Sequence, residues 1–387
     1  MESRGAQKIN NMKIAIIAKN SNVLPSPKDK TWAPGVVMWN EARALVKRNI
    51  NVRVYCAKGS KVAGDVVDFD MPSFYDSAAD TDETQKLVRL VYYSNVYQMK
   101  VIKHLKENPV DIIHLHDFRD YPFYKEANLN TPILVTIHGD FFLNFNDIPD
   151  ALKADMNSIP VLAIGDVSQI PEGMNPPVAV IPNILELKRF KLIEKPKNRM
   201  LFTSRLIIEK GPDIAIKASH LAKVKLAMYG GIIGDSNWRN KINRLIKNNS
   251  EITYFGHLPH SKIEQAFNGK ALLFPLRGAE GFPSVVIESM VSGTPVIAFA
   301  ISGVRNLIKD GVNGFLVKPG DIKGMAKAIK KVDMIDRKKC REYTLKQFNE
   351  LAISNKLIAT FEKTIKEYNE LYSRIDFPQF SLNPINN

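Results

Sequence analysis

The chain has 387 residues, 45% of them hydrophobic and 24% charged, which is the composition of an ordinary globular protein long enough for two or three domains. Its two cysteines, Cys56 and Cys340, match no metal-ligand spacing and are too few for a disulfide framework, so they favour a reducing compartment. The start is polar, and no later run approaches the roughly 18 apolar residues of a membrane span. We therefore expect a cytoplasmic protein with at most weak, peripheral contact with a membrane.

The net charge of +14 is concentrated in one half of the chain. Residues 1–190 contain 22 Lys and Arg against 22 Asp and Glu, and the remaining 32 and 18 lie in residues 191–387. This division predicts two domains with an anionic ligand on the second. A nucleic-acid-binding protein would also be basic, but its basic runs usually contain interleaved aromatic residues. The run from Lys330 to Arg341 has none, so we expect solvated side chains there and no nucleic-acid partner.

Short apolar runs alternate with helical patterns along the first half, which predicts the buried strands and covering helices of a parallel α/β sheet. The expected strands are Lys13–Lys19, Val52–Cys56, Asp111–His116, Ile133–Ile137, Val161–Ile164 and Val178–Ile181, and the expected helices are Val36–Asn49 and Thr84–Asn108. We expect the aromatic residues of the second helix in the core. Gly35, just before the first helix, could let the backbone approach a phosphate, but it also fits a plain helix start.

His138 follows the predicted strand Ile133–Ile137 directly. Ligands in doubly wound folds bind beyond the carboxyl ends of the strands, which makes His138 a candidate site residue. A single histidine at such a place is also often structural, so this position by itself leaves both interpretations open.

A polar, charged segment with a proline, residues 191–198, lies where the net charge changes, and we place the domain boundary there. A second series follows, with a helix from Pro212 and strands at Met200–Thr203, Lys225–Tyr229, Ile252–Phe255, Ala271–Pro275 and Pro295–Phe299. An amphipathic helix at 355–374 is expected to pack back on the first domain, and residues 375–387 form a loose tail. The predicted fold class is α/β, with Rossmann-like doubly wound parallel-sheet domains at 12–190 and 191–354 that face a cleft.

The segment from Ala279 to Ser302 places Glu280 and Glu288 eight positions apart, around a helix start predicted at Pro283 and Ser284. The unpaired N–H groups at a helix start bind phosphate readily, and carboxylates beside them can accept hydrogen bonds from ribose and sugar hydroxyls. A nucleotide sugar fits this arrangement. The spacing by itself is also that of an ordinary loop, helix and strand with solvated glutamates.

Four blocks of the sequence carry a family resemblance: VIPNILELKRF, TSRLIIEKGPDIAIKA, AEGFPSVVIESMVSGTPVIAF and GVRNLIKDGVNGFLV. They resemble segments of the GT-B glycosyltransferases, in the retaining, nucleotide-sugar-dependent family 4, and the resemblance extends over most of the chain. It implies that Arg205 and Lys210 bind the donor diphosphate, that Glu280 binds the sugar and Glu288 the ribose, and that His138, in TIHGD, lies near the transferred sugar. The further donor-binding residues that it implies are Gly281, Phe282, Pro283, Ser284, Val285, Gly230 and Gly35.

Two positions depart from the family pattern. Gly35 stands where many members have two adjacent glycines, and Ile184 stands where they usually have a glycine after the asparagine. In addition, Gly230 and Gly231 follow a predicted strand but lack the three-glycine spacing of a dinucleotide-binding fingerprint.

The resemblance implies transfer of a hexose from a UDP- or GDP-hexose to a hydroxyl acceptor, with retention of configuration by front-face attack, so no nucleophile is named. The sequence has no metal-binding aspartate motif, and we expect neither a metal nor a cofactor; Arg205, Lys210 and helix N–H groups would neutralise the diphosphate. Two alternatives stay open: a non-catalytic nucleotide-sugar-binding module, and a nucleotide-sugar epimerase or phosphorylase on the same fold. The acceptor, whether a saccharide, a lipid or a small molecule, is not indicated by these residues.

Overall fold

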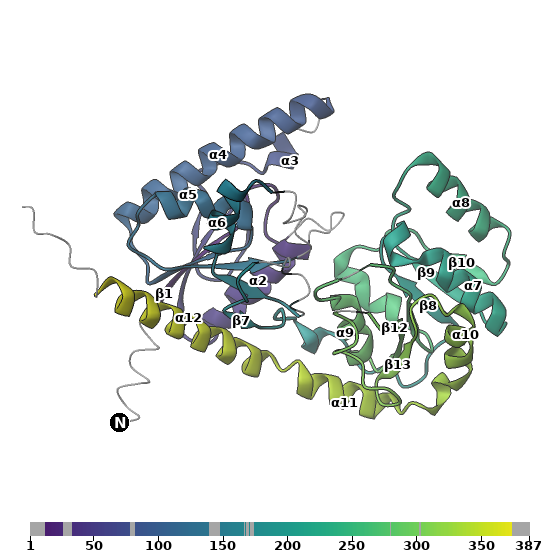
Figure 1. Cartoon of the computed structure of the whole chain (residues 1–387). Helices are drawn as coiled ribbons and strands as arrows, with labels where there is room; N and C mark the ends of the chain where they lie inside the picture. Colours follow the sequence, from purple (N-terminus) through teal and green to yellow (C-terminus); the bar gives the residue numbers. More distant parts are fainter. Residues whose placement is uncertain are drawn as a thin grey trace, which may run out of the picture.

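The computed structural model of the chain describes residues 12–25, 33–77, 82–138, 148–165, 167, 170, 174–278, 280–301 and 303–373. Its strands form two separate parallel sheets, one of seven strands and one of six. Figure 1 shows the two sheets in adjacent lobes, each surrounded by helices. The prediction of two Rossmann-like parallel-sheet domains is confirmed.

The first sheet has the strand order β3-β2-β1-β4-β5-β6-β7. The register places Ile16 of β1 beside His114 of β4, and His114 beside Leu134 of β5. Because the strands are parallel, their carboxyl ends meet at one edge of the sheet, and residues just beyond them become neighbours. The strands are β1 (Lys13–Ile17), β2 (Asn51–Tyr55), β3 (Asp65–Val67), β4 (Ile112–Leu115), β5 (Ile133–Ile137), β6 (Val161–Ala163) and β7 (Ala179–Val180).

The helices of the first domain are α2 (Ala33–Val46), α3 (Phe74–Ser77), α4 (Glu83–Glu107), α5 (Tyr121–Glu126) and α6 (Asp150–Asn157). Helix α2 begins three residues before its predicted start. Pro34 is tolerated there because the N–H groups of a first helical turn have no intrahelical acceptor. Gly35 therefore lies inside the first turn of α2, where it is buried.

Helix α4 corrects one expectation, because its aromatic residues are not all in the core. Tyr97 is fully buried, whereas Tyr92 is 67% exposed. The helix has apolar side chains on two faces, and only one face packs on the sheet; the outer face carries Leu87, Val88, Val91, Tyr92 and Met99. Figure 1 shows α4 along the outside of its domain, with the far side toward solvent. Among the described helices, none is long and apolar enough to cross a lipid bilayer.

The second sheet has the strand order β10-β9-β8-β11-β12-β13. Its strands are β8 (Met200–Thr203), β9 (Leu226–Tyr229), β10 (Ile252–Tyr254), β11 (Leu272–Phe274), β12 (Val296–Phe299) and β13 (Gly314–Val317). The helices packed around it are α7 (Pro212–Ala222), α8 (Ser236–Lys247), α9 (Ser284–Val291), α10 (Ile322–Lys331) and α11 (Arg337–Gln347). Strands β8, β9, β11 and β12 are buried throughout, as expected for parallel strands covered on both faces.

The segment that joins the two domains is held by two arginines of α11. Arg337 Nε donates to Ile193 O at 2.6 Å, and Arg341 Nη1 donates to Phe190 O at 2.7 Å. The expectation that the whole basic run from Lys330 to Arg341 is solvated is therefore wrong for these two side chains, although the lysines of the run are exposed. The reason is tertiary: the joining segment passes beside α11 and offers carbonyl groups that need donors.

The helix α12 (Glu350–Tyr372) returns to the first domain and runs along its lower side in Figure 1. It begins five residues before the predicted start, because Asn349 caps it by accepting a hydrogen bond from Ala352 N at 3.0 Å. Further along the helix, Phe361 is fully buried and packs edge-on against the His114 ring, with 5.3 Å between the ring centroids.

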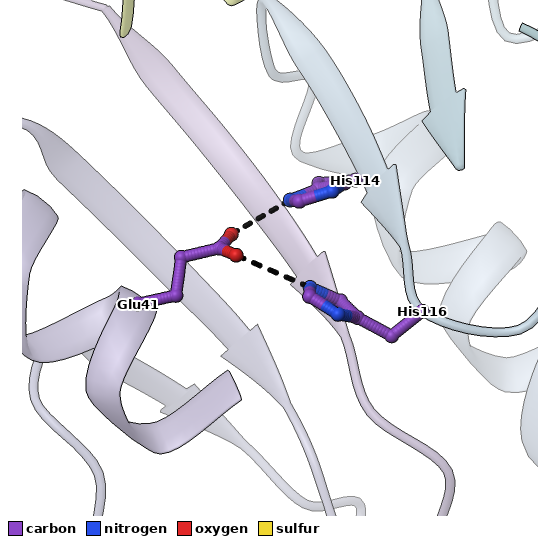
Figure 2. Close-up of side chains that lie close together, drawn as sticks. All are labelled: Glu41, His114 and His116. Atoms are coloured by element: carbon purple, nitrogen blue, oxygen red, sulfur yellow. Dashed lines mark hydrogen bonds and ion pairs between the residues drawn. The ribbon is translucent and has the colours of Figure 1, made fainter. Parts of the chain in front are cut away.

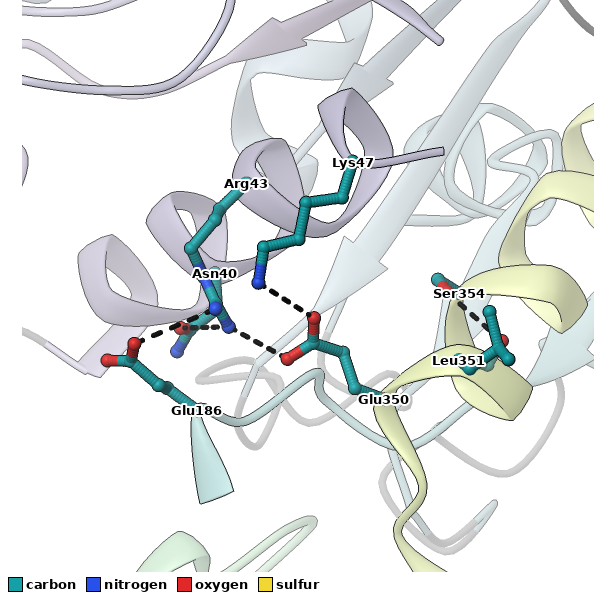
Figure 3. Close-up of polar contacts among 7 residues, drawn as sticks. All are labelled: Asn40, Arg43, Lys47, Glu186, Glu350, Leu351 and Ser354. Atoms are coloured by element: carbon teal, nitrogen blue, oxygen red, sulfur yellow. Dashed lines mark hydrogen bonds and ion pairs between the residues drawn. The ribbon is translucent and has the colours of Figure 1, made fainter. Parts of the chain in front are cut away.

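Arg43 of α2 lies at the centre of the contact between α2 and α12, as Figure 3 shows. Its guanidinium is 3.0 Å from Glu350 of α12 and 3.6 Å from Glu186, which precedes the joining segment. Lys47, the first residue after α2, adds a contact of 3.4 Å to Glu350. The same helix that supplies Arg43 also carries a buried carboxylate toward the sheet, at Glu41.

Candidate active site

Lys210 and Glu280 are 70 residues apart in the sequence but meet at the carboxyl edge of the second sheet. Lys210 ends the 3-10 turn η5 (Ile208–Lys210) after β8, and Glu280 lies in the loop between β11 and α9. Because β8 and β11 are neighbours in the sheet, the loops beyond their carboxyl ends adjoin. Lys210 Nζ lies 2.5 Å from Glu280 Oε2. Lys210, predicted to bind the diphosphate, and Glu280, predicted to bind the sugar, are thus in contact.

Arg277 ties these two loops together, a role that the sequence did not indicate. Its Nη1 donates to Ile208 O at 2.6 Å, and its backbone N–H donates to Glu209 O at 2.7 Å. Its Nη2 donates to Asp213, at 2.9 Å, and Asp213 is buried in the first turn of α7. These contacts fix the position of the loop that carries Glu280. No motif marks Arg277, so only the folded contacts reveal it.

Arg205 follows β8 by two residues, and its side chain is exposed. The neighbouring loop after β9 contains Gly230, whose φ is +134° and where a Cβ would lie 1.8 Å from Ser204 O. Glycine therefore lets this loop pack directly on the backbone beside Arg205. In the structure, Gly230 permits this close packing, and the packing fixes the position of the loop that carries Arg205.

The residues from Gly281 to Val285 form the start of α9. The helix begins at Ser284, and its N-cap, Pro283, makes no side-chain capping hydrogen bond. The first N–H groups of a helix lack intrahelical acceptors and lie at the positive end of its dipole. Phe282 is buried and anchors the turn through an edge-on contact with Phe348, with 6.0 Å between the ring centroids. This turn is suited to bind an anion such as a phosphate.

The start of α9 faces the first domain. Gly165 follows β6 by two residues, and a Cβ at Gly165 would lie 2.1 Å from Gly281 O, so the two domains touch through backbone atoms here. Strand β6 pairs with β5, whose carboxyl end leads into His138. The edge of the first sheet that carries His138 is therefore on the side of the loop that carries Glu280.

Glu288 lies one turn inside α9, as predicted, and is 9% exposed. Burial raises the pKa of its carboxyl group to about 7, although the charge of Arg189 acts in the opposite direction. Among the residues that the structure describes, none donates a hydrogen bond to this carboxyl group. Buried carboxyl groups usually have a donor, and one with a raised pKa beside a ligand-binding turn is a candidate site residue.

A second polar cluster lies in the first domain, and sequence reasoning identified only its outermost member, His138. Figure 2 shows Glu41 of α2 pointing at His114 of β4 and at His116, just beyond β4. His114 Nδ1 lies 2.6 Å from Glu41 Oε1, and Thr136 Oγ1 lies 2.7 Å from His114 Nε2. The alternating histidines of DIIHLH, at the end of a predicted strand, are the signal that would have indicated this cluster.

His116 connects the buried carboxylate to His138. Its Nε2 lies 3.7 Å from Glu41 Oε2, and its Nδ1 lies 2.8 Å from His138 Nε2. The rings of His116 and His138 are nearly parallel, with 5.0 Å between centroids and 12° between planes. His116 is buried, whereas His138 is half-buried at the edge of the sheet.

The pKa values of the cluster follow from burial and from these contacts. Burial alone would raise the pKa of Glu41, but His114 and His116 together hold it well below its ordinary value. Burial lowers the pKa of His116, and lowers that of His138 to about 3. At neutral pH, Glu41 is therefore ionised while His116 and His138 are neutral imidazoles.

Glu41, His114 and His116 are also residue types that bind metal ions, and their ligand atoms lie within 4.8 Å of one another. The contacts fit hydrogen bonds better. The 2.6 Å between His114 Nδ1 and Glu41 Oε1 is shorter than the roughly 3.3 Å that separates two ligands of one tetrahedral zinc ion. In addition, Thr136 occupies the other nitrogen of His114. We therefore describe the cluster as a hydrogen-bond network.

A pocket of about 360 Å³ lies on the first domain, away from these residues. It is lined at the amino ends of β5 and β7 by Ile133 and Val178, and by Thr364 of α12. Ligands of doubly wound folds bind at the carboxyl ends of the strands, which is the opposite edge of this sheet. The pocket is therefore separate from the candidate active site.

Two family models match the chain in consecutive regions. The model described as glycosyl transferases group 1 matches residues 183–347, and the model described as Glycosyltransferase Family 4 matches residues 34–159. The first region contains Arg205, Lys210, Glu280 and Glu288. The second contains the cluster of Glu41 and the three histidines. Both groups of candidate residues thus lie inside the parts of the chain that match.

Several known proteins similar to this chain are described as glycosyltransferases. An uncharacterized glycosyltransferase of Methanocaldococcus jannaschii is 28% identical over 258 residues, which are 62% of this chain and 70% of that protein. A D-inositol 3-phosphate glycosyltransferase of Catenulispora acidiphila is 28% identical over 144 residues, 34% of this chain and 34% of that protein. This second match therefore spans only about a third of that relative.

Among solved structures, Anabaena HepE in complex with UDP and glucose has a TM-score of 0.67 to this chain at 17% sequence identity, and the match covers 91% of this chain and 100% of that chain. At this identity the likeness shows a shared fold. The two parallel-sheet domains, the two consecutive family matches and the relatives agree with one another. The chain belongs to the GT-B glycosyltransferases of group 1 and family 4.

Proposed function

We propose that the protein transfers a hexose from a nucleoside diphosphate sugar, a UDP- or GDP-hexose, to a hydroxyl acceptor with retention of configuration. The observation that carries this proposal is the Lys210–Glu280 contact of 2.5 Å beside the uncapped start of α9. This site combines the positive charge of Lys210, the N–H groups at the start of α9 and the carboxylate of Glu280. A nucleoside diphosphate sugar requires these three groups, for its diphosphate and for the sugar hydroxyls.

The diphosphate would be bound by Arg205, by Lys210 and by the N–H groups at the start of α9. On donor binding, Lys210 exchanges part of its contact with Glu280 for the diphosphate, and Glu280 accepts hydrogen bonds from the sugar. Glu288 accepts hydrogen bonds from the ribose hydroxyls, which supply the donors that its buried carboxyl group needs. These side chains neutralise the diphosphate from the protein itself, so the proposal includes no metal ion.

The reaction breaks the bond between the anomeric carbon and the diphosphate oxygen and forms a bond from that carbon to the acceptor oxygen. The acceptor attacks on the face that the diphosphate leaves, and its proton passes to a diphosphate oxygen, so the configuration is retained. Negative charge develops on the leaving diphosphate, where Arg205, Lys210 and the helix N–H groups stabilise it. The sugar becomes oxocarbenium-like, and Glu280 and His138 are the side chains that we place beside it.

The solved structure of HepE supports this donor class, since that protein was observed with UDP and glucose. The two family matches support the transferase activity itself. The two other functions considered for this fold, a non-catalytic nucleotide-sugar-binding module and an epimerase or phosphorylase, differ from the proposal in what they do to the donor. They can therefore be separated by the same experiment.

The experiment is a thermal-shift screen with UDP-glucose, UDP-N-acetylglucosamine, GDP-mannose and ADP-glucose, followed by an assay for release of the nucleoside diphosphate. A ligand at 100 times its Kd stabilises the folded protein by about 2.7 kcal/mol. We expect one nucleotide class to stabilise the protein and its sugar to be released slowly without an acceptor. Binding without release indicates a binding module, phosphate-dependent release a phosphorylase, and an inverted sugar hydroxyl an epimerase.

A further inference from the structure

We propose that Glu41 acts through His116 as a positioning residue, which fixes the proton of His138 on Nε2 and leaves His138 Nδ1 as an acceptor for a hydroxyl group of the sugar substrate. This inference deepens the proposed function and rests on it for the identity of the hydroxyl group. Its basis is the set of distances in the cluster and the order of the side chains, which runs from the buried Glu41 through His116 to His138 at the edge of the sheet.

The first step is the orientation of His116. Glu41 is ionised and can only accept hydrogen bonds. His116 Nε2 lies 3.7 Å from Glu41 Oε2 and has no hydrogen-bond partner among the described residues. A lone pair on Nε2 would face the negative carboxylate, whereas an N–H group there is attracted to it. The proton of neutral His116 is therefore on Nε2, and its Nδ1 is an acceptor.

The second step is the orientation of His138. His116 Nδ1 and His138 Nε2 are 2.8 Å apart, so one of them must donate. Since His116 Nδ1 carries a lone pair, the donor is His138 Nε2. A neutral imidazole has a single N–H group, and the pKa of His138, about 3, keeps it neutral. Its Nδ1 therefore carries a lone pair, and among the described residues none hydrogen-bonds to this atom.

The other side of Glu41 is satisfied in a compatible way. His114 Nδ1, 2.6 Å from Glu41 Oε1, is the donor because a carboxylate only accepts, and Nε2 of the neutral ring then accepts from Thr136 Oγ1, 2.7 Å away. This branch occupies one carboxylate oxygen and leaves the other for His116. All the short contacts of the cluster thus agree with one arrangement of protons, which a single ionised carboxylate determines.

The consequence for the substrate is a choice of partner. His138 is half-buried beyond the carboxyl end of β5, on the side of the sheet edge that meets Gly281 of the second domain. With a lone pair on Nδ1, His138 accepts a hydrogen bond from a hydroxyl group but cannot donate one to an ether or carbonyl oxygen. Glu41, which is buried in α2 and has no access to the substrate itself, would thus select a sugar hydroxyl at this position.

The direct test is the protonation pattern of the histidines in the full chain without ligand. Selective ¹⁵N-histidine labelling and long-range ¹H–¹⁵N correlation spectra distinguish Nδ1–H from Nε2–H rings. We expect His116 and His138 to be Nε2–H rings and His114 to be an Nδ1–H ring. A His138 ring with its proton on Nδ1 would overturn the proposal, and this measurement needs no variant.

The variant Glu41→Gln tests the causal link. The glutamine oxygen can still accept from His114, but its NH₂ group then faces His116 Nε2 and donates to it. We expect the proton of His116 to move to Nδ1 and that of His138 to move to Nδ1 in turn. The matched control is Tyr55→Phe, which removes a hydroxyl 2.9 Å from the separate histidine His104 and should leave the His138 signals unchanged. An unchanged His138 in Glu41→Gln contradicts the proposal.

A kinetic measurement separates positioning from a purely structural role. With whichever of the four nucleotide sugars is turned over in the screen above, Glu41→Gln should lower kcat about 3- to 10-fold, the effect of one lost hydrogen bond, while the Kd for the nucleoside diphosphate stays as in wild type. If Glu41→Gln does not fold, His116→Phe breaks the same connection and takes its place. Unchanged kcat with an altered His138 ring overturns the hydroxyl contact. If no nucleotide sugar is turned over, the proposed function fails, while the spectra still decide whether Glu41 sets the His138 ring.

Discussion

The two sheet edges that face each other in this protein differ in how far their polar side chains are paired within the protein. On the first domain, His114 contacts Glu41 and Thr136 at 2.6 and 2.7 Å, His116 contacts His138 at 2.8 Å, and an ion pair of 3.7 Å joins His116 to Glu41. On the second domain, Glu288 is buried and Arg205 is exposed, and neither side chain makes a hydrogen bond with another residue that the structure describes. At the first edge the inner groups are held by contacts within the protein and the outermost atom, His138 Nδ1, stays open, whereas the second edge leaves charge and several hydrogen-bonding groups for a ligand.

The difference shows how a protein can divide recognition between two domains. A hydrogen-bond network that is formed before binding holds its outermost group rigidly, because its inner members are already fixed by contacts with one another. A site with unsatisfied groups gains those contacts only when the ligand arrives, and so can distinguish strongly between a ligand that supplies donors and one that does not. The following changes test this contrast, from the largest expected effect to the smallest.

Arg205→Ala should have the largest effect, because its guanidinium stabilises charge that develops on the leaving diphosphate. We expect kcat to fall about 10²–10³-fold, as when one preorganised donor of a transition state is lost. The control is Arg239→Ala, since Arg239 is another exposed arginine of the same domain. Steady-state release of the nucleoside diphosphate measures both. Equal losses in the two variants would mean that only the overall charge of the domain matters.

The two edges should respond to pH with opposite signs. Glu288 has a pKa raised to about 7, so the folded state binds its proton more tightly than the unfolded state; the stability that this provides is present below about pH 4.5 and is lost as the pH rises through 7. His138 has a pKa lowered to about 3, so its contribution is present above about pH 6.5 and is lost as the pH falls.

Urea unfolding from pH 4.5 to 8 measures these contributions. Glu288→Gln should be more stable than wild type at pH 8, by an amount on the order of 3 kcal/mol for a shift of this size, and should have lost the decrease between pH 5 and 7. His138→Gln should flatten the acidic side alone. Identical pH profiles for the two variants would show that the two edges do not differ in this way.

Glu41→Leu tests how far the first edge depends on its single carboxylate. The substitution removes the acceptor of His114 and the charge beside His116, so we expect a loss of about 1.5–3 kcal/mol in the free energy of unfolding, the range for hydrogen bonds to charged groups. Thr136→Val is the graded control, because it removes one neutral hydrogen bond and should cost about 0.5–1.5 kcal/mol. A smaller loss for Glu41→Leu than for Thr136→Val would contradict the central position of Glu41.

Glu280→Ala tests whether the carboxylate at the second edge contacts the sugar. We expect affinity for the intact nucleotide sugar to fall about tenfold, the loss of one charge-assisted hydrogen bond, while affinity for the nucleoside diphosphate stays the same or increases, since Lys210 loses its present partner. Calorimetric titration with both ligands measures this. The exposed Glu251 supplies the control substitution. A parallel loss for both ligands would remove Glu280 from the sugar.

Glu350→Gln should have the smallest effect. Its ion pairs with Arg43 and Lys47 join α12 to α2 (Figure 3), but these side chains are partly exposed, and such pairs contribute about 0–1 kcal/mol. The matched control is Glu367→Gln, which removes a more exposed pair with Lys363. Urea unfolding at low and high salt measures both. A loss well above 1 kcal/mol would show that the return of α12 depends on this contact.

The sequence by itself determined the parts of the protein that depend on local patterns. The alternation of apolar runs and helical patterns predicted both parallel sheets, because buried parallel strands are apolar over several consecutive residues. The helix start at Pro283 and Ser284 placed Glu280 in the loop and Glu288 one turn inside the helix, since helix starts and ends are set by a few adjacent residues.

Only the tertiary structure decided which distant side chains meet. Glu41, His114 and His138 lie on three separate elements, and they come together because β1, β4 and β5 are neighbours in the sheet while α2 packs against it. Arg277 has no motif and acts only through Ile208 and Asp213. The same reason explains the corrected expectations: whether Tyr92 is buried or Arg337 is solvated depends on what packs beside it, and neighbours in space are chosen by the order of the strands and not by spacing along the chain.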